Sequence, residues 1–573
     1  MNAKRLVLAG AVVVLALGWL AHGVAVKAAS VGTATIQHVL LLSIDGMHAA
    51  DFYNCSHGIA GVNDGNPYCP NMAGLAQTGI NYVNVTSSRP SDSFPGLAAL
   101  VTGGSPKTTG MYYDVAYDRS LDPPTVTTGT GLAGGPCKAY GLPSGTTTDY
   151  DQGIEYDDTK LNGGAPGAGP TEGGIASIDP QKLVRDPQMG CAPVYPWNFV
   201  RVNTIFSVVN AAGGYTAWID KHASYSFTAG PGGTGLNDYY SPEVDSNVIP
   251  LPGVTTSQGI SCATIRDKSS AGSVWSASFA NIQCYDALKV QALLNEINGE
   301  THDGKPAQVP ALFGMNFQSV YIGESVSEPG VGMGGYKNAA AEPSAELVKE
   351  IEFVDASIGD IVQGLMNAGI YSNTLVIISA KHGGSPIDTS QYVADGTNTP
   401  ATFLANAGCI PYSESPLNLT GIGATEDDVS VIWLNHNCTV VNSVELLDKN
   451  ASAIGLGEIY YGPTLALNYG VGGLNPGEDP RSPDIIVTPN VGITYSGSTT
   501  MIADHGGFAH DDTNVMMLVA NPSLTAQTVY TGVTTMQVAP TIVDVLGLSP
   551  GALDAVRMEG TEVLPSVIGQ LNK

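Results

Sequence analysis

Short apolar runs that stop abruptly at polar residues constrain the fold of this chain more than any other feature. The run at residues 38–44 ends at Asp45, and the run at residues 374–379 leads into Lys381 and His382. Uninterrupted apolar runs of this length are typical of strands that are buried on both faces, as in parallel sheets. The pattern predicts an α/β protein with a mostly parallel central sheet.

Further runs at residues 484–487 and 515–519, the second just after His505, predict additional strands. Apolar residues recur at helical spacing over residues 351–365, and Gly369 is well placed to end that helix. Ligands of open parallel sheets gather beyond the carboxyl ends of the strands. The polar residues that follow these runs are therefore candidates for a functional site.

The N-terminus has the three parts of a secretory signal. Lys4 and Arg5 precede the apolar run 6–26, and two alanines follow it. This predicts a signal peptide over residues 1–29 and an exported body over residues 30–573, either secreted or periplasmic. The alternative is an uncleaved membrane anchor, because the run is just long enough to span a bilayer.

Eight cysteines agree with an exported protein, because their number is even and no pair has the C-x-x-C spacing of a metal or redox motif. The simplest arrangement links neighbours in the sequence. The predicted disulfides are Cys55–Cys69, Cys137–Cys191, Cys262–Cys284 and Cys409–Cys438.

The formal net charge is −28, with 23 Lys plus Arg. Such a surface repels nucleic acid polymers and anionic membranes. A small anionic substrate can bind only where a metal ion or local positive charge reverses this field. No membrane contact is expected beyond the N-terminal anchor already mentioned.

The region from 115 to 310 differs in character from the rest, because its part from about 125 to 174 is rich in Gly, Thr and Pro with weak periodicity. We interpret residues 115–310 as an inserted cap that disulfides hold in place. An ordinary surface excursion is the alternative.

Four residues stand out for their order along the chain: Asp45 after a strand, Ser93 before a helix, His382 after a strand, and His505 in an Asp-His-Gly sequence. Each alone has a structural explanation, as a turn residue, a helix cap or a buried histidine. A serine at a helix N-terminus is also a suitable nucleophile, because free N–H groups and the helix dipole favour an incoming phosphate.

With these residues in this order, the chain resembles the nucleotide pyrophosphatase/phosphodiesterase branch of the alkaline phosphatase superfamily. The resemblance implies an alkaline-phosphatase-like α/β sandwich, with helices on both faces of the sheet, that hydrolyses phosphate esters. The matching segments are 44–46, 93–95, 100–103, 109–110, 354–359, 379–383, 503–507 and 538–541.

The resemblance also implies a mechanism with one or two divalent ions, zinc being the expected metal. Asp45 would bind an ion that also coordinates Ser93, whose oxygen attacks phosphorus and forms a phosphoserine. His382 and His505 would each bind a metal ion, with Asp504 as a further ligand. The expected partner is a small phosphorylated substrate.

Three positions depart from the family pattern. Lys381 stands where the family has an aspartate ligand, and Gln318 falls near a second aspartate position with no histidine following at the usual spacing. Asp114 occupies a place where phosphodiesterases commonly have an asparagine that donates to phosphate. A carboxylate there would repel substrate unless it pairs with Lys381 or binds metal.

Two interpretations of the metal site follow. In one, a single ion remains on Asp45, Ser93 and His382 or His505, and Lys381 replaces the second ion as a point charge. In the other, new ligands come from a group near His505: Asp504, His510, Asp511 and Asp512.

Lys221 and His222 add positive charge and are candidates to face the phosphate, although an ordinary surface pair is the alternative. Two other functions remain open. A sulfatase would need an arginine that the Ser93-Phe-Pro sequence lacks, and a non-catalytic binding protein of the same fold would explain the missing ligands.

Overall fold

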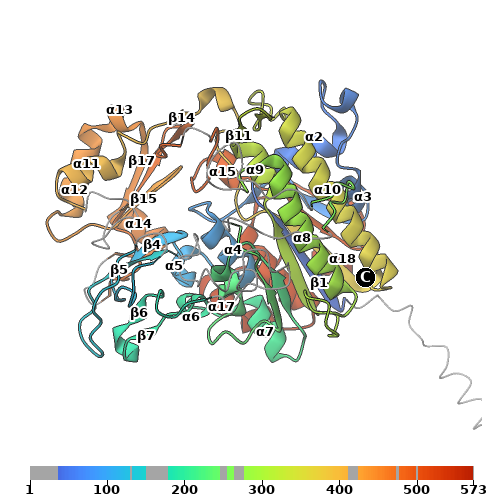
Figure 1. The fold of residues 1–573 in the computed structure, drawn as a ribbon, viewed down its shortest axis with the longest axis horizontal. Coiled ribbons are helices and arrows are strands. Elements are labelled where there is room, and N and C mark those ends of the chain that lie inside the picture. Colours follow the sequence, from blue (N-terminus) through green and yellow to red (C-terminus); the bar gives the residue numbers. More distant parts are fainter. Residues whose placement is uncertain are drawn as a thin grey trace, which may run out of the picture.

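An eight-stranded sheet forms the centre of the molecule, with strand order β21-β2-β20-β13-β1-β10-β8-β9 (Figure 1). The computed structural model describes residues 36–128, 132–149, 178–244, 254–262, 276–410, 424–472, 477–498 and 501–571, so the predicted signal peptide lies outside the described residues. The strands are β1 (His38–Ile44), β2 (Gly79–Tyr82), β8 (Ala217–Ile219), β9 (Asp238–Tyr240), β10 (Leu312–Phe317), β13 (Thr374–Ser379), β20 (Met517–Ala520) and β21 (Gln527–Val529).

The five strands β13, β1, β10, β8 and β9 run parallel to one another. The predicted strands at 38–44 and 374–379 are confirmed as β1 and β13. The expectation of parallel pairing is wrong for the run at 515–519, because β20 is antiparallel to both β13 and β2. An apolar run reports burial on both faces and carries no information about strand direction.

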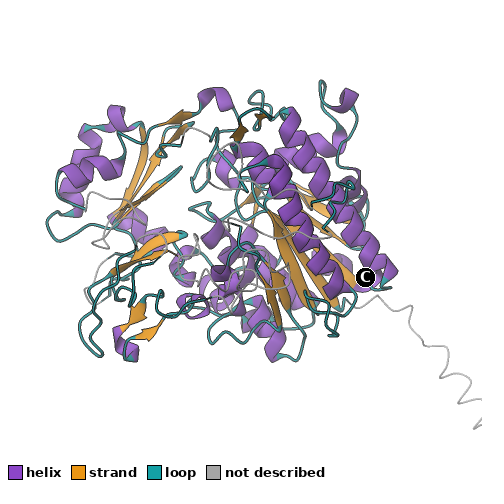
Figure 2. Cartoon of the chain, in the orientation of Figure 1, coloured by secondary structure: helices purple, strands orange, loops and turns teal. Residues whose placement is uncertain are grey.

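Helices cover both faces of the central sheet (Figure 2). Val39 and Leu41 of β1 pack in one cluster, whereas Leu40 and Leu42 pack in the other. The first cluster includes α4 (Ser93–Thr102), α7 (Ile205–Ala211) and α16 (Val538–Val545), and the second includes α8 (Phe279–Ile297) and α10 (Ala345–Asn367). Helix α10 confirms the predicted helix over 351–365 and stops before Gly369, whose φ is +74°.

A second, smaller sheet packs beside the first and was not predicted from the sequence. It is antiparallel with order β15-β16-β18-β17 and lies at the upper left of Figure 1. The run at 484–487 belongs to this sheet rather than to the central one. Its strands are β15 (Ala424–Glu426), β16 (Ser430–Ile432), β17 (Leu456–Tyr461) and β18 (Ile485–Pro489), packed against α11 (Pro400–Asn406) and α12 (Val440–Lys449).

The range 115–310 is not a single cap. Strands β8 and β9 complete one side of the central sheet, and helices α7 and α8 cover opposite faces of it. This part of the range is therefore core, and the cap interpretation stays a prediction only for its remainder.

All four predicted disulfides are confirmed, each between cysteines that are neighbours in the sequence. In the described part of the chain, no helix has the length and apolar character that crossing a membrane requires.

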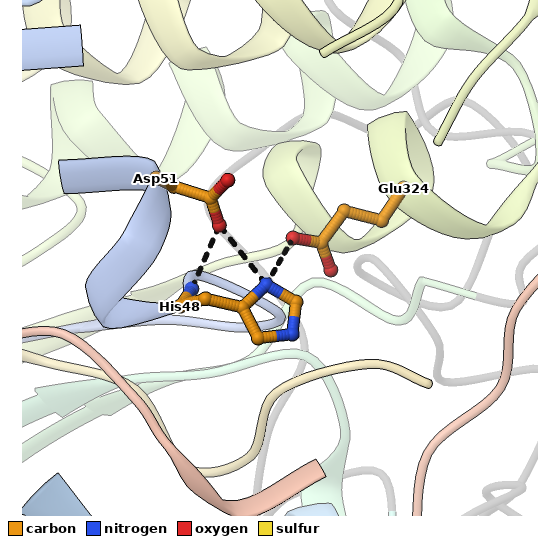
Figure 3. A group of neighbouring side chains, drawn as sticks. All are labelled: His48, Asp51 and Glu324. Atoms are coloured by element: carbon orange, nitrogen blue, oxygen red, sulfur yellow. Dashed lines mark hydrogen bonds and ion pairs between the residues drawn. The ribbon is translucent and has the colours of Figure 1, made fainter. Parts of the chain in front are cut away.

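A buried polar cluster joins the end of β1 to two other elements (Figure 3). His48 Nδ1 lies 3.0 Å from Asp51 Oδ2 and 3.2 Å from Glu324 Oε1, and the Tyr336 hydroxyl contacts all three side chains. Burial raises the pKa of Glu324 to about 7, although the neighbouring imidazole of His48 opposes this shift. On the other side of the ring, His48 Nε2 lies 2.9 Å from the Gly384 carbonyl oxygen. The cluster thus anchors the loop that follows β13.

Candidate active site

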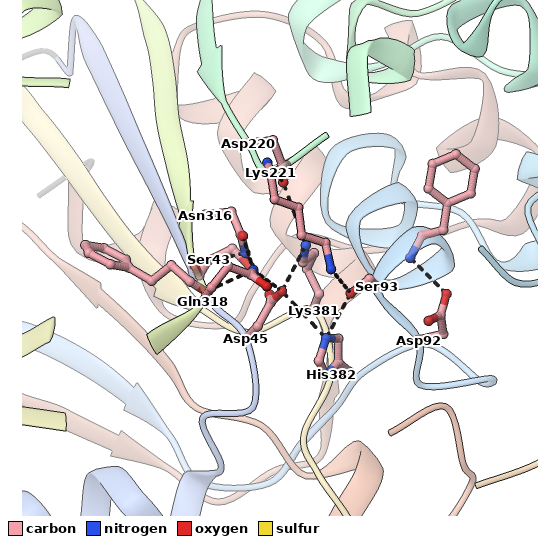
Figure 4. Close-up of polar contacts among 12 residues, drawn as sticks. Ser43, Asp45, Asp92, Ser93, Asp220, Lys221, Asn316, Gln318, Lys381 and His382 are labelled. Atoms are coloured by element: carbon pink, nitrogen blue, oxygen red, sulfur yellow. Dashed lines mark hydrogen bonds and ion pairs between the residues drawn. The ribbon is translucent and has the colours of Figure 1, made fainter. Parts of the chain in front are cut away.

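Polar side chains follow the carboxyl ends of four adjacent parallel strands, β13, β1, β10 and β8 (Figure 4). Lys381 and His382 follow β13, Asp45 follows β1, Gln318 follows β10, and Lys221 follows β8. Because these ends lie at one edge of the sheet, residues far apart in the sequence meet there. The structure therefore brings together the predicted residues of the first three strands with Lys221 of the fourth, which the sequence offered as a candidate to face the phosphate.

Ser93 is the first residue of α4 and is not its cap. Asp92 is the N-cap, and its carboxylate accepts the Phe94 N–H at 3.0 Å. Pro95 has no N–H, and the N–H of Gly96 bonds to the Asp92 carbonyl at 2.9 Å. The free N–H groups that the sequence suggested for phosphate binding are thus largely used within the helix.

The Ser93 hydroxyl lies between a histidine and a lysine (Figure 4). Ser93 Oγ is 3.0 Å from His382 Nε2 and accepts from Lys221 Nζ at 3.3 Å. His382 Nδ1 lies 2.8 Å from the Gly383 carbonyl oxygen and therefore carries a proton, which leaves the Nε2 lone pair facing Ser93. This arrangement can take the hydroxyl proton from Ser93.

Asp45 is surrounded by groups that donate to its carboxylate. Asn316 Nδ2 donates to Oδ1 at 2.7 Å, and Gln318 Nε2 donates to Oδ2 at 2.6 Å. The Lys381 ammonium lies 3.2 Å from Oδ2, and His382 Nε2 lies 3.7 Å from it. Burial alone would raise the pKa of Asp45, but Lys381 and His382 hold it well below its ordinary value. Asp45 is an anion fully balanced by protein groups.

The two lysines share one aromatic neighbour. Lys381 Nζ lies 4.6 Å and Lys221 Nζ 5.7 Å from the centroid of the Tyr225 ring. Lys381 is fully buried, and its Nζ also lies 4.0 Å from Asp220 Oδ1. The surface interpretation of Lys221 is wrong, because this residue is 9% exposed and contacts Ser93. The neighbouring residue His222 contacts Glu243 instead, with Nδ1 2.7 Å from Glu243 Oε1.

His505 lies beside the predicted site. Its ring centroid is 4.1 Å from that of His382, and its Nδ1 is 3.5 Å from Asp92 Oδ1. Asp504 Oδ1 accepts a hydrogen bond from the backbone N–H of His505 at 2.9 Å and one from the Tyr321 hydroxyl at 3.3 Å. Burial raises the pKa of Asp504 to about 6.

The carboxylates of the alternative ligand group serve the backbone instead. Asp511 Oδ2 accepts the Ile387 N–H at 2.9 Å, and Asp512 accepts the N–H groups of Gly507 and Ala509, each at 3.2 Å. These contacts hold the loop around His505 in place. They give Asp511 and Asp512 a structural role and do not favour a metal site rebuilt from these two residues.

Asp114 contributes to the site through its backbone. Its N–H donates to Asp92 Oδ2 at 3.1 Å, and its Oδ1 accepts the Val115 N–H at 2.6 Å. Asp114 therefore supports the residue that caps α4. The role in phosphate binding that the sequence suggested stays a prediction.

The side chains present do not fit a two-ion metal site. Lys381 provides an ammonium at a ligand position, and Gln318 directs its NH2 group at Asp45. Among the described residues, the group of three His, Cys, Asp or Glu ligand atoms that lie within 4.8 Å of one another is His48, Asp51 and Glu324, outside this site. A single ion would depend on Asp45, Ser93 and either His382 or His505, whose ring centroids lie 4.1 Å apart.

A pair of buried carboxyl groups near His505 predicts how stability depends on pH. Burial raises the pKa of Asp512 to about 7 and that of Asp428 well above its ordinary value, and the two side chains share a hydrogen bond. The unfolded chain, with a pKa of 3.8, loses these protons first. Their stabilising effect is therefore present below about pH 4 and is lost as the pH rises to about 7.

We expect the free energy of unfolding to be higher at about pH 5 than at about pH 8, by more than about 1 kcal/mol. Asp428→Asn should reduce this difference, because its amide can donate to Asp512 without a shared proton. Urea unfolding of both proteins at the two pH values measures this difference in unfolding free energy. An equally large difference in the variant would contradict the assignment.

Comparison with known proteins identifies a matching family and structures of similar fold. The family model for type I phosphodiesterase / nucleotide pyrophosphatase matches residues 39–137 and 331–508. No curated protein matches the sequence. Of solved structures, inactive murine ectonucleotide pyrophosphatase / phosphodiesterase 5 in complex with AMP is similar over 90% of this chain and 96% of that one, with 13% identity and a TM-score of 0.51.

Two further structures of ectonucleotide pyrophosphatase / phosphodiesterase 5, one murine and one human, each have 13% identity, the same coverage of both chains and a TM-score of 0.49. The likeness to the AMP complex shows a shared fold. The match to the family model indicates the activity, which is hydrolysis of phosphoric ester bonds. The matched segments contain Asp45, Ser93 and His382 and leave out β8 with Lys221. The chain belongs to the type I phosphodiesterase / nucleotide pyrophosphatase branch of the alkaline phosphatase superfamily and hydrolyses phosphoric ester bonds.

Proposed function

We propose that this chain is an exported phosphodiesterase that uses Ser93 as its nucleophile and forms a covalent phosphoseryl intermediate. The observation that supports this most directly is the position of Ser93 Oγ, 3.0 Å from His382 Nε2 and 3.3 Å from Lys221 Nζ. The histidine can accept the hydroxyl proton, and the ammonium stabilises the oxygen anion that results.

The reaction then has two steps, formation and hydrolysis of the Ser93 phosphoryl ester. Ser93 Oγ bonds to phosphorus as its proton passes to His382 Nε2, and the bond from phosphorus to the first alcohol oxygen breaks, with that oxygen taking up a proton. Water then attacks the phosphorus of the Ser93 ester. The Oγ–P bond breaks, Oγ regains a proton, and a phosphate monoester leaves.

The local charge favours a diester over a monoester. Two ammonium groups, Lys221 and Lys381, lie beside two carboxylates, Asp45 and Asp220, so their formal charges cancel. A diester carries one negative charge, whereas a monoester carries nearly two at neutral pH. In a chain of net charge −28, the singly charged ester is easier to bind.

Export is supported by the predicted signal peptide and by the four disulfides, which persist in oxidising compartments. A divalent ion, with zinc expected, remains a separate prediction from the sequence. Asp45, Ser93 and either His382 or His505 are the residues that would hold it. The proposal on Ser93 does not depend on that ion.

Turnover of three nitrophenyl esters tests the function. We expect the protein to hydrolyse bis-p-nitrophenyl phosphate faster than p-nitrophenyl phosphate, and p-nitrophenyl sulfate least. Faster cleavage of the sulfate ester would support the sulfatase alternative. If a folded sample cleaves none of the three, with and without added zinc, the hydrolase proposal fails and the binding alternative is favoured.

A further inference from the structure

We infer that Lys221 and Lys381 take the place of the divalent ions of the family, so that this chain binds phosphate and cleaves its ester without a metal. This inference rests on the proposed function and concerns the same site. Its evidence is the position of the two ammonium groups and the hydrogen bonding of the Asp45 carboxylate beside Lys381.

Each lysine stands next to an atom that would otherwise bind an ion. Lys381 Nζ lies 3.2 Å from Asp45 Oδ2, and Lys221 Nζ lies 3.3 Å from Ser93 Oγ. A zinc ion bonded to both oxygens at about 2 Å would sit within about 5 Å of both ammonium groups. Two positive charges at that distance in a buried site repel a dication.

The carboxylate that would attract an ion is already neutralised. Asn316 and Gln318 donate to the two oxygens of Asp45 at 2.7 and 2.6 Å, in addition to the Lys381 ion pair. Asp286 fixes this arrangement, because its Oδ2 accepts the backbone N–H of Gln318 at 2.8 Å. A metal ion would have to displace amide donors that the fold holds in place.

Lys381 has hydrogen-bonding capacity to give to a ligand. It is fully buried, yet within the described part of the chain its Nζ donates no hydrogen bond, and its neighbours there are the Asp45 and Asp220 carboxylates and the Tyr225 ring. A buried ammonium normally finds acceptors. A phosphate oxygen bound between Ser93 and Lys381 would supply them, and Lys221 would stabilise the charge that develops on the reacting oxygens.

The test begins with wild-type protein dialysed against a chelator, with residual metal measured by mass spectrometry and the melting temperature measured as a check of the fold. Turnover of bis-p-nitrophenyl phosphate is then compared with and without added zinc. We expect the two rates to agree within about twofold. A loss of more than about tenfold that zinc restores would overturn the inference while leaving the Ser93 proposal intact.

Lysine variants provide the second arm. Lys221→Met and Lys381→Met should each reduce turnover by about 10²-fold or more, and the matched Arg variants should recover part of it. Lys349→Met serves as the control, because that lysine is exposed and pairs with Glu346 on the surface of α10. Unchanged turnover in both Met variants would contradict the inference.

Binding of orthovanadate separates the inference from the activity. Metal-free wild-type protein should bind the anion, and Lys381→Met should bind it at least about tenfold more weakly at an unchanged melting temperature. Binding that appears only after zinc is added would overturn the inference even if no ester is cleaved. Absence of turnover in a wild-type protein that binds vanadate would count against the proposed function alone.

Discussion

Ser93→Ala is expected to reduce turnover of bis-p-nitrophenyl phosphate by at least about 10³-fold, because it removes the only atom proposed to bond to phosphorus. The side chain is 1% exposed and its hydroxyl has polar partners on two sides, so the substitution removes a reacting group and little packing. Steady-state rates of the purified variant measure the effect.

The control is Ser88→Ala, at a buried serine whose hydroxyl donates to the Pro90 carbonyl oxygen at 2.7 Å and not to the site. It should keep turnover within about threefold of wild type, while the melting temperatures of both variants stay close to that of wild type. Ser93→Ala that retains more than about a tenth of the wild-type rate would show that another group attacks phosphorus.

Asp286→Ala is expected to lower the free energy of unfolding by about 3–5 kcal/mol, the largest stability effect we predict. Asp286 and Lys289 form a fully buried ion pair at 3.0 Å on α8. Asp286 Oδ2 also accepts the N–H groups of Gln318 and Ser319, each at 2.8 Å. Removing the carboxylate leaves the Lys289 ammonium uncompensated and releases the segment that positions Gln318.

Urea unfolding measures this loss, with Lys349→Ala as the control at an exposed pair with Glu346. The control should change stability by less than about 1 kcal/mol. If Asp286→Ala costs no more than the control, the buried pair does not support the strand end, and the account of how Gln318 is positioned is wrong.

Much of the fold and part of the site could be predicted because local sequence carries the signal. The apolar runs before Asp45 and Lys381 are confirmed as β1 and β13, and α10 and all four disulfides lie where expected. The order of Asp45, Ser93 and His382 along the chain was sufficient to indicate that they meet.

The fourth strand end was missed because its run is short. Strand β8 has three residues, Ala217–Ile219, and lies in a region whose composition suggested a cap. The polar residues after it, Asp220 and Lys221, follow the same pattern as Asp45 after β1. The antiparallel direction of β20 and the division into two sheets also escaped prediction, because both depend on long-range pairing that local hydrophobicity does not encode.

The most direct test of the central claim is to trap the covalent intermediate. The protein is mixed with excess bis-p-nitrophenyl phosphate, quenched in acid within the first turnovers, digested and analysed by mass spectrometry. The account predicts a p-nitrophenyl phosphoryl group on the peptide that contains Ser93, attached to Ser93 itself and absent from Ser93→Ala. Active turnover that proceeds with the adduct on a different residue would contradict it.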